Sequence, residues 1–353
     1  MTPVRLGVIG CGVIGPTHIA AAVESPLLEV VAVADLIEER ARSAAERSSV
    51  PRTYREGADL LEDPDVEAVV LAFPAQKRTE LALRALARGK HVLIEKPIAM
   101  NSDEVRQMIA ARGSLTAACC SSRFRFLPAA RAAADLIATG ALGQLRLVRC
   151  RHVLPCGPKP ETPRPEWRLK KALNAGGILC NWGCYDLDYL LGITGWQLRP
   201  KAVFAQVWTV PPQFESHVWP GSDAETHYTA LVRCEGGTVI SIERGEYMPA
   251  GGDEAWQIIG TRGSLKLRMV TGNPKTIIHD DTSAEEGVVS RTLWEGDENG
   301  RLTSSGPVTD FAAAIREGRE PMTGLEHALV VQQITDAVYA SARRGTASRI
   351  PGK

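Results

Sequence analysis

The chain has 353 residues, enough for two domains, and its 44% hydrophobic and 23% charged residues are ordinary for a globular protein. Lys+Arg and Asp+Glu are balanced at 41 each, so charge gives no reason to expect nucleic acid or an anionic membrane as a partner. No apolar run approaches the roughly 18–20 residues that span a bilayer, and the N-terminal residues lead directly into a structured segment, so we expect no membrane span, no signal peptide and a cytoplasmic protein.

Strand and helix patterns alternate through the first 120 residues. Short β-branched apolar runs predict buried strands at 4–10, 28–35, 66–74, 90–97 and 115–120. Periodic runs between them predict helices at 13–25, 36–48, 79–87 and 102–112, the last capped by Ser102. This alternation is typical of a doubly wound parallel sheet, so we predict an α/β Rossmann domain over residues 1–122.

The pattern changes after residue 122. We predict a helix at 128–139, a strand at 143–153 and a proline-rich loop at 155–165. Strands then dominate at 226–234, 237–247, 255–260 and 264–269, before helices at about 308–317 and 325–343. We therefore predict an α+β domain with a largely antiparallel open sheet over residues 123–353, and leave open whether the closing helices pack back on the first domain.

The first predicted strand ends in a glycine-rich motif. The sequence Gly10-Cys11-Gly12-Val13-Ile14-Gly15 is GxGxxG between a buried strand and a helix, the context in which this motif binds a dinucleotide. Gly10 permits the tight turn, Gly12 lets the backbone approach a pyrophosphate, and Gly15 lets the helix pack on the strand. The amides at the helix start, at Val13 and Ile14, would face the phosphates. The alternative is a glycine-rich turn without a ligand.

A carboxylate follows the second predicted strand. Asp35 lies 20 residues beyond Gly15, where an acidic side chain accepts hydrogen bonds from the ribose hydroxyls and repels a 2′-phosphate. NAD is therefore favoured over NADP. Arg40 lies close enough in sequence to reach a phosphate, which keeps NADP open.

Charged residues also end the strand at 90–97. Glu95 and Lys96 precede Pro97 at the carboxyl end of a predicted parallel strand, where open α/β sheets bind ligands. The proline favours an extended conformation at Lys96 and so fixes how its side chain projects. From the residues alone, a surface ion pair is the competing interpretation.

A polar group marks the stretch LCNWGCYDLDYLLG, residues 179–192. On a helix at 100° per residue, Asn181, Tyr185 and Asp188 fall within an arc of about 60°, opposite a leucine face that would belong to the core. This polar face contains no Lys, Arg or Glu, which favours a binding site over a solvent-exposed surface.

Together these segments resemble the glucose–fructose oxidoreductase / inositol dehydrogenase / MocA family. The resemblance is carried, in order, by GVIGCGVIG, VVAVAD, LAFP, GKHVLIEKPIA, EWR, AGGILCNWGCYDLD, IGTRGSLKL and DFAAAIREGREPMTG. It implies NAD(P) on the first domain and a sugar, polyol or related compound against the sheet of the second. It also implies that Lys96 is the active-site lysine and that Phe73-Pro74 lines the cofactor site, together with Glu95.

This chain departs from the family pattern at several positions. The family usually has Asp and His where Asn181 and Tyr185 stand here, while Asp188 is kept. It also often has His at Arg78 and Asn at Ala75, so the nicotinamide-side contacts are less well defined. Some branches of the family carry Tyr at the His position, so this substitution does not by itself abolish catalysis.

We therefore predict hydride transfer from a sugar, cyclitol or related polyol to NAD, with Tyr185 accepting the hydroxyl proton. A free phenol has a pKa of about 10, and Lys96 as a nearby cation would lower it and stabilise the developing alkoxide. Asn181 would hydrogen-bond to a substrate hydroxyl or to Lys96. Asp188 would either bind a hydroxyl pair or anchor its helix.

The remaining candidates have two readings each. Arg168, in Trp167-Arg168, either reaches cofactor or substrate or forms a structural ion pair, and Arg123 could line the cleft.

The eight cysteines lack zinc-site spacing, so we expect reduced, mostly buried thiols and no metal. The open sheet needs a cover, which predicts a homodimer or homotetramer through that sheet.

Two other functions stay open. The first is an NAD-dependent lyase, epimerase or glycoside-cleaving enzyme in which transient oxidation leaves no net NADH, and the changes at Asn181 and Tyr185 keep it in view. The second is a non-enzymatic NAD-binding sensor, against which Lys96 and a proton-accepting Tyr185 both argue.

Overall fold

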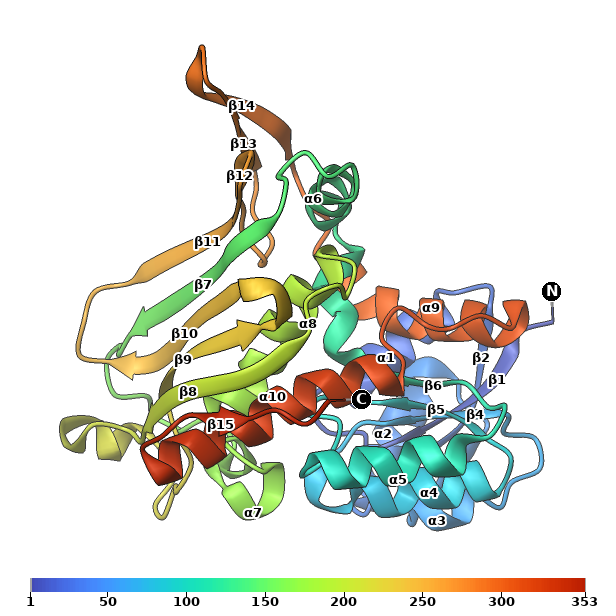
Figure 1. Cartoon of the computed structure of the whole chain (residues 1–353). Helices are drawn as coiled ribbons and strands as arrows, with labels where there is room; N and C mark the ends of the chain where they lie inside the picture. Colours follow the sequence, from blue (N-terminus) through green and yellow to red (C-terminus); the bar gives the residue numbers. More distant parts are fainter. Residues whose placement is uncertain (1, 353) are drawn as a thin grey trace. The chain divides into compact units, whose positions relative to one another are not determined.

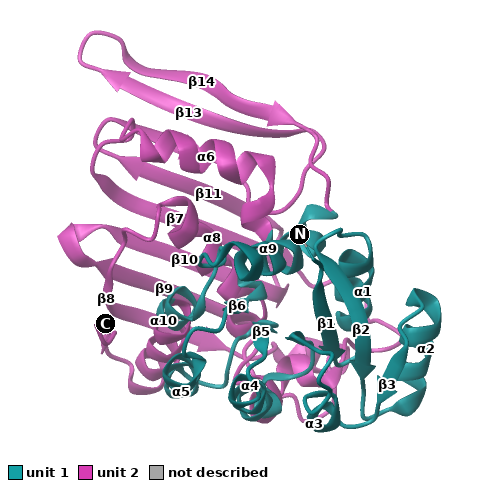
Figure 2. Ribbon diagram, turned by 90° about the vertical axis from the view of Figure 1, so that its right-hand side faces the viewer, with its two compact units in different colours: residues 1–123, 301–330 teal, residues 124–300, 331–353 magenta. Residues whose placement is uncertain are grey.

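The computed structural model describes residues 2–352 and divides the chain into two compact units. Figure 1 follows the chain from end to end, and Figure 2 colours the two units. Unit 1 comprises residues 1–123 and 301–330, and unit 2 comprises residues 124–300 and 331–353. The segment 301–330, which follows unit 2 in the chain, is thus part of unit 1.

Unit 1 is built on a six-stranded sheet in which every pairing is parallel. In spatial order the strands are β3 (Arg52–Tyr54), β2 (Leu28–Ala34), β1 (Val4–Ile9), β4 (Ala68–Leu71), β5 (His91–Ile94) and β6 (Ala117–Cys119). This is the strand order of a dinucleotide-binding sheet. The chain adds β2 and β3 on one side of β1 and then returns to add β4, β5 and β6 on the other side, so the order of the strands reverses between β1 and β4. The predicted Rossmann fold is therefore confirmed.

Helices cover both faces of this sheet, because its strands are apolar on both sides. One core lies under α1 (Gly15–Val23), α2 (Glu38–Ser48) and α9 (Leu302–Glu317). The other lies under α3 (Gly57–Leu60), α4 (Arg78–Ala87), α5 (Ser102–Arg112) and the first turns of α10 (Leu325–Arg344). A short helix, η1 (Ala75–Lys77), precedes α4.

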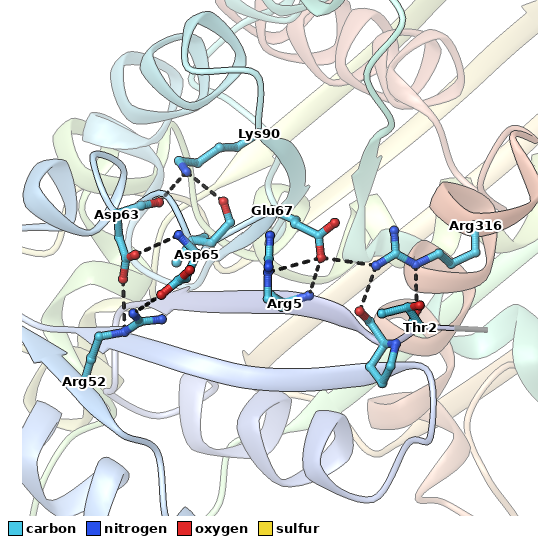
Figure 3. A network of polar contacts seen from close by, with 10 residues as sticks. Thr2, Arg5, Arg52, Asp63, Asp65, Glu67, Lys90 and Arg316 are labelled. Atoms are coloured by element: carbon cyan, nitrogen blue, oxygen red, sulfur yellow. Dashed lines mark hydrogen bonds and ion pairs between the residues drawn. The ribbon is translucent and has the colours of Figure 1, made fainter.

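Polar contacts tie α9 to the start of the chain (Figure 3). Arg316 donates to the carbonyl oxygens of Thr2 and Pro3 at 2.9 and 2.8 Å and to the Glu67 carboxylate at 3.2 Å. The same carboxylate accepts the Arg5 backbone N–H at 3.0 Å. These contacts join α9, β1 and the segment before β4, and they explain how a helix late in the chain completes unit 1.

Unit 2 contains a nine-stranded sheet. In spatial order its strands are β14 (Gly287–Gly296), β13 (Lys275–Ser283), β12 (Gly263–Lys266), β11 (Asp253–Gly260), β7 (Leu145–Pro155), β10 (Val239–Met248), β9 (His227–Cys234), β8 (Pro200–Trp208) and β15 (Ser348–Arg349). All neighbours are antiparallel except β7 and β10, which pair in parallel. The predicted, largely antiparallel sheet is confirmed.

The other elements of unit 2 are helical. They are α6 (Pro128–Ala138), η3 (Glu166–Leu169), α7 (Lys171–Asn174), a π-helical segment η4 (Leu179–Gly183), α8 (Cys184–Ile193), η5 (Pro212–His217), η6 (Glu235–Gly237) and the second part of α10, while η2 (Cys120–Phe126) crosses the unit boundary. α8 packs on the sheet through an edge-to-face contact of Tyr189 with Trp256, at 5.9 Å between ring centroids. On β8 and β9, Phe204 and Leu231 form an exposed cross-strand pair.

Element boundaries differ from the prediction where local chemistry was misread. The cap of α5 is Asn101, whose side chain accepts the Glu104 backbone N–H at 3.0 Å, and not Ser102. α9 begins at Leu302, six residues before the predicted start, with Pro307 inside the helix. A proline in the second turn costs one early hydrogen bond, which the packing of α9 against α1 outweighs. Strands β3, β8, β13 and β14 carried no specific prediction.

Between residues 2 and 352, every helix is too short or too polar to cross a membrane.

Candidate active site

The glycine-rich loop between β1 and α1 requires glycine at both ends. Gly10 has φ +98°, and a Cβ at this position would lie 2.5 Å from the Ala72 carbonyl oxygen. A Cβ on Gly15 would lie 1.8 Å from the Gly10 carbonyl oxygen, so only glycine lets α1 start against the strand end. Both positions match the roles predicted for them.

The outer side of this loop is open. A Cβ on Gly12 would meet only Nη1 of Arg40 within 4 Å, at 3.9 Å. The neighbouring Val13 is 77% exposed, Ile14 is half-buried, and Arg40 is exposed. The loop therefore leaves a cradle that suits the pyrophosphate of a dinucleotide, with Arg40 beside it.

Asp35 holds the loop in place. Its Oδ2 accepts the Cys11 backbone N–H at 2.7 Å, and its Oδ1 accepts the Ile37 backbone N–H at 2.9 Å. Each carboxylate oxygen has a second lone pair, so these bonds are compatible with the predicted ribose contacts. Those contacts remain a prediction.

Glu95 is buried at the end of β5 and collects three donors. Its Oε1 accepts from Nε2 of His18 in α1 and from Nη2 of Arg123, each at 2.8 Å, and its Oε2 accepts the Lys96 backbone N–H at 3.0 Å. Burial alone would raise the pKa of Glu95, but Arg123 and His18 outweigh it and hold that pKa well below its usual range. The carboxylate thus fixes the backbone that carries Lys96.

The thiol of Cys120 lies beside this group, 3.9 Å from Nε2 of His18. The three donor atoms of His18, Glu95 and Cys120 are close enough together to hold a metal ion. However, Arg123 already pairs with the same carboxylate oxygen as His18, and its cation would repel a metal. Burial also raises the pKa of the Cys120 thiol. We therefore interpret these residues as a hydrogen-bonded cluster.

Arg78 fixes the ends of two parallel strands. Its buried guanidinium donates to the carbonyl oxygens of Phe73, Glu95 and Pro97, the second at 2.5 Å. Phe73 follows β4, and Glu95 and Pro97 flank Lys96 after β5, so one side chain sets the backbone on both sides of Lys96. The Lys96–Pro97 peptide is cis. The sequence showed Arg78 only as a departure from the family pattern and not as this clamp.

In unit 2, a glycine pair precedes the predicted polar helix. A Cβ on Gly176 would lie 1.8 Å from the Tyr339 hydroxyl, and one on Gly177 would lie 1.9 Å from the Glu225 carbonyl oxygen. The Glu225 carboxylate accepts the backbone N–H of Gly177 at 3.0 Å and of Leu179 at 3.1 Å, and the Tyr339 hydroxyl at 2.7 Å. These contacts fix the start of the next segment.

That segment is π-helical at residues 179–183 and becomes α-helical at Cys184. Single π-helical turns occur often at functional sites. Asn181, Tyr185 and Asp188 are all buried, so the polar side chains do not face solvent. The predicted arc assumed regular α-helical geometry, which does not hold through Asn181. The Tyr185 ring contacts Phe124 and Trp182 edge-on, at 5.3 and 5.6 Å between centroids.

Two buried ion pairs hold α8. Arg125 approaches Asp188 at 2.8 Å, and Arg244 of β10 binds both carboxylate oxygens of Asp186 at 2.6 and 2.5 Å. The Arg244 guanidinium also lies 4.9 Å from the Trp182 ring centroid. Sequence reasoning missed Asp186, Arg244, Glu225, Tyr339 and His18. Their partners are 46 to 114 positions away, and no local spacing signals them.

Arg168 forms an ion pair. Its Nη2 lies 3.3 Å from Oε2 of Glu246, which also binds Arg164 at 2.6 Å. Lys96 and Arg123 belong to unit 1, whereas Asn181, Tyr185, Asp188 and Arg168 belong to unit 2. Their roles in one common site remain a prediction.

Comparison with known proteins decides the family. A family model described as the GFO/IDH/MocA oxidoreductase family, NAD-binding Rossmann fold, matches residues 4–119, and that of the GFO/IDH/MocA C-terminal domain matches residues 130–266. The rhizopine catabolism protein MocA of Rhizobium meliloti is 30% identical over 76% of this chain and 79% of its own length. The chain belongs to the GFO/IDH/MocA oxidoreductase family.

Other relatives span the chain more fully or carry a named activity. An oxidoreductase of Rhizobium meliloti, ORF334, is 28% identical over 98% of both chains. A trans-1,2-dihydrobenzene-1,2-diol dehydrogenase of Mus musculus is 31% identical over 57% of this chain and 59% of its own. An oxidoreductase domain protein from Kribbella flavida superposes with a TM-score of 0.85 at 25% identity, over 99% of this chain and all of that one. Levoglucosan dehydrogenase in complex with NADH gives 0.83 at 22%, with the same coverage.

These matches confirm the predicted family, fold and oxidoreductase class, with NAD as the family cofactor. In this chain, the open loop at Gly12 and the tight approach at Gly15 provide the cradle that such a cofactor needs.

Proposed function

We propose that this protein is an NAD-dependent dehydrogenase that oxidises a hydroxyl group of a sugar, cyclitol or related polyol. The observation that carries the proposal is the fixed backbone around Lys96 at the carboxyl end of β5, where Arg78 donates to the carbonyl oxygens of Glu95 and Pro97 and the Glu95 carboxylate accepts the Lys96 backbone N–H. A lysine held in this way at a strand end suits catalysis better than a surface ion pair. Relatives named as diol, anhydrosugar and rhizopine enzymes support the substrate class.

The cofactor would be held by the loop of Gly10, Gly12, Val13, Ile14 and Gly15. The Asp35 carboxylate would accept hydrogen bonds from the ribose hydroxyls and repel a 2′-phosphate, which favours NAD over NADP. Arg40 would lie beside the phosphates. Phe73 and Pro74, held by Arg78 at the end of β4, would line the nicotinamide side. When bound, NAD⁺ supplies the hydride acceptor.

Side chains of the protein would accept the proton of the substrate hydroxyl and stabilise the negative charge that develops on its oxygen. Tyr185 would accept the hydroxyl proton, with its ring held by Phe124 and Trp182. Lys96 would stabilise the developing alkoxide and favour the phenolate. Asn181 has no useful pKa, so it would orient the substrate hydroxyl or the Lys96 amine.

The other predicted residues would act in two ways. Arg125 beside buried Asp188 supports an anchoring role for Asp188, because the ion pair fixes α8. Glu95 and Arg123 would act as positioning residues, since their side chains form an ion pair and Glu95 also accepts the Lys96 backbone N–H. Arg168 keeps a substrate-binding role, which its partly open guanidinium supports.

We also propose that the uncovered sheet face around Phe204 and Leu231 forms a homodimer or homotetramer interface. Phe204 and Leu231 are each about half exposed and lie opposite one another on neighbouring strands, and adjoining exposed apolar side chains are characteristic of protein–protein contact surfaces. Light scattering should show a dimer or tetramer, and Phe204→Arg should shift it toward the monomer. Seven of the eight cysteines are buried, and buried cysteine thiols are typical of proteins in a reducing compartment such as the cytoplasm.

The test is a screen of NAD⁺ reduction across monosaccharides, inositols and anhydrosugars, with Lys96→Met as the matched variant. We expect NADH with at least one of these compounds, and Lys96→Met should still bind NADH but lose about a hundredfold or more in kcat/KM. Solvent deuterium entering a substrate without NADH would indicate the redox-neutral reaction instead. Neither NADH nor deuterium with any compound, or a fully active Lys96→Met, would overturn the proposal.

A further inference from the structure

His18 is a buried side chain that the proposed chemistry leaves without a role. It lies in the first turn of α1, just after the glycine-rich loop, and is only 1% exposed. Its backbone N–H donates to the carbonyl oxygen of Ile14 at 3.1 Å, which helps to close the first turn of α1. Its ring nitrogen Nε2 lies 2.8 Å from Oε1 of Glu95, at the end of β5. One residue thus joins the loop that would hold the cofactor phosphates to the strand end that precedes Lys96.

Strand pairing alone does not provide this link. In the sheet of unit 1, β4 lies between β1 and β5, so the glycine-rich loop and Lys96 follow strands that are not neighbours. His18 and Glu95 are 77 positions apart in the sequence, and their side chains meet directly. The placement of Lys96 relative to the glycine-rich loop therefore depends on this contact as well as on the sheet.

The contact requires a hydrogen on Nε2 of His18. Burial raises the pKa of Glu95, but Arg123 and His18 hold it well below its usual range, so the carboxylate can only accept. Nδ1 of His18 is buried and has no hydrogen-bond partner within the described chain. A second hydrogen, on Nδ1, would be a buried donor without an acceptor, which is costly. The neutral ring fits the site, so the contact needs one N–H donor at the Nε2 position and no charge.

His18 and Arg123 donate to the same oxygen of Glu95 from different elements. His18 belongs to α1 and Arg123 to η2, and each donor nitrogen lies 2.8 Å from Oε1. The other oxygen, Oε2, accepts the Lys96 backbone N–H at 3.0 Å. A carboxylate with one donor can turn about that contact, whereas donors from two elements fix its plane. His18 is the more rigid of the two donors, because its ring is buried and an arginine side chain has more rotamer freedom to lose.

We propose that His18 is a positioning residue that sets Lys96 relative to the cofactor loop. It acts through Glu95, whose carboxylate holds the Lys96 backbone N–H. The inference rests on the proposed function, in which Lys96 stabilises the developing alkoxide. Misplacing a catalytic group by about 1 Å can cost on the order of a hundredfold in rate, so loss of the His18 donor should lower kcat. Cofactor affinity should persist, because the backbone bond to Ile14 does not depend on the His18 side chain.

The test uses variants that separate the donor of His18 from its volume and from the stability of α1. His18→Gln keeps an amide N–H near the position of Nε2. His18→Leu removes the donor, and the shorter amide of His18→Asn ends near the position of Nδ1, out of reach of Glu95. Ile19→Val is the matched control, because Ile19 is equally buried in α1 and its truncation weakens the packing of this helix without removing a donor.

The readouts are the dissociation constant for NADH, the hydrogen exchange of the Lys96 backbone amide, and kcat and KM with the best substrate of the NAD⁺ screen. We expect His18→Leu and His18→Asn to speed exchange of the Lys96 amide at least about threefold and to lower kcat at least about tenfold. NADH binding and KM should change less than about twofold. His18→Gln should recover most of both losses, and Ile19→Val should resemble wild type in each readout.

Retained NADH binding shows that a variant is folded, and one folded loss variant is sufficient for the test. Wild-type exchange and kcat in a folded His18→Leu or His18→Asn would overturn the proposal, since His18 would then only fill space. A His18→Gln variant as slow as His18→Leu would also refute it, because the ring and not the donor would be required. An equal loss of kcat in Ile19→Val would assign the effect to the stability of α1 and refute it too.

Failure of the proposed function has a different outcome. If no compound of the screen yields NADH with wild type, the proposed function fails alone, because amide exchange and NADH binding still test the contact between His18 and Glu95.

Discussion

Glu225 accepts the backbone N–H of Gly177 on both carboxylate oxygens, each at 3.0 Å, and this contact fixes the start of the segment that carries Asn181. The carboxylate is buried, and the Tyr339 hydroxyl donates to it from α10 at 2.7 Å. Burial raises the pKa of Glu225, while Tyr339 and the backbone donors lower it. A backbone held this tightly leaves little freedom to the π-helical turn that follows.

This arrangement predicts different costs for alanine at the two glycines. A Cβ on Gly177 meets the backbone of Glu225, which cannot move aside, whereas a Cβ on Gly176 first meets the tip of the Tyr339 side chain. We expect Gly177→Ala to cost about 3 kcal/mol of unfolding free energy and Gly176→Ala less. Adding Tyr339→Phe should reduce the cost of Gly176→Ala only. Urea unfolding of the single and double variants measures this, and additive effects at Gly176 would contradict it.

Two tyrosines of α8 offer a matched pair for the proposed proton transfer. Tyr185→Phe keeps the ring contacts with Phe124 and Trp182, so it should lower kcat by about a hundredfold to ten-thousandfold while leaving NADH binding unchanged. Tyr189→Phe is the control, because the Tyr189 hydroxyl is buried without a hydrogen-bond partner in the described chain. That variant should keep activity and unfold at the same or a higher temperature. Equal kcat values for the two variants would rule out Tyr185 as the base.

Sequence reasoning succeeded where the signal is local. The glycine loop, the parallel strands and Glu95-Lys96 at a strand end follow from short motifs and apolar periodicity, and the structure contains each of them. It failed where the partner is distant in the sequence, because no spacing indicates that His18 binds Glu95 or that the Tyr339 hydroxyl lies against Gly176. Asn101 and Ser102 are both acceptable caps, and only the structure shows which side chain turns toward the helix.

The choice between NAD and NADP depends on Asp35 and Arg40. The Asp35 carboxylate would repel a 2′-phosphate, and Arg40 lies on the open side of the loop near Gly12. Asp35→Ser should lower kcat/KM for NAD⁺ and raise it for NADP⁺, changing their ratio by at least about tenfold. Adding Arg40→Ala should lower the NADP⁺ value again. Steady-state kinetics with both cofactors measures this, and an unchanged ratio in Asp35→Ser would assign Asp35 to loop structure alone.

His91, at the start of β5, should make stability depend on pH. Burial lowers the pKa of His91, and its Nδ1 accepts the Thr116 backbone N–H at 2.8 Å, which requires that nitrogen to be unprotonated. The unfolded chain therefore binds the proton more readily, so this contribution is complete above the unfolded pKa and is lost as pH falls through the folded one. His91→Asn keeps an acceptor near Nδ1 but does not titrate. The unfolding temperature of wild type should therefore fall more than that of His91→Asn between about pH 8 and about pH 5.5, a range that brackets the ordinary histidine pKa of about 6.5. Comparing the two chains cancels groups that titrate in both, such as His152, whose burial lowers its pKa to about 4. Parallel curves for wild type and His91→Asn would show that His91 keeps the same proton affinity in the folded and unfolded chain.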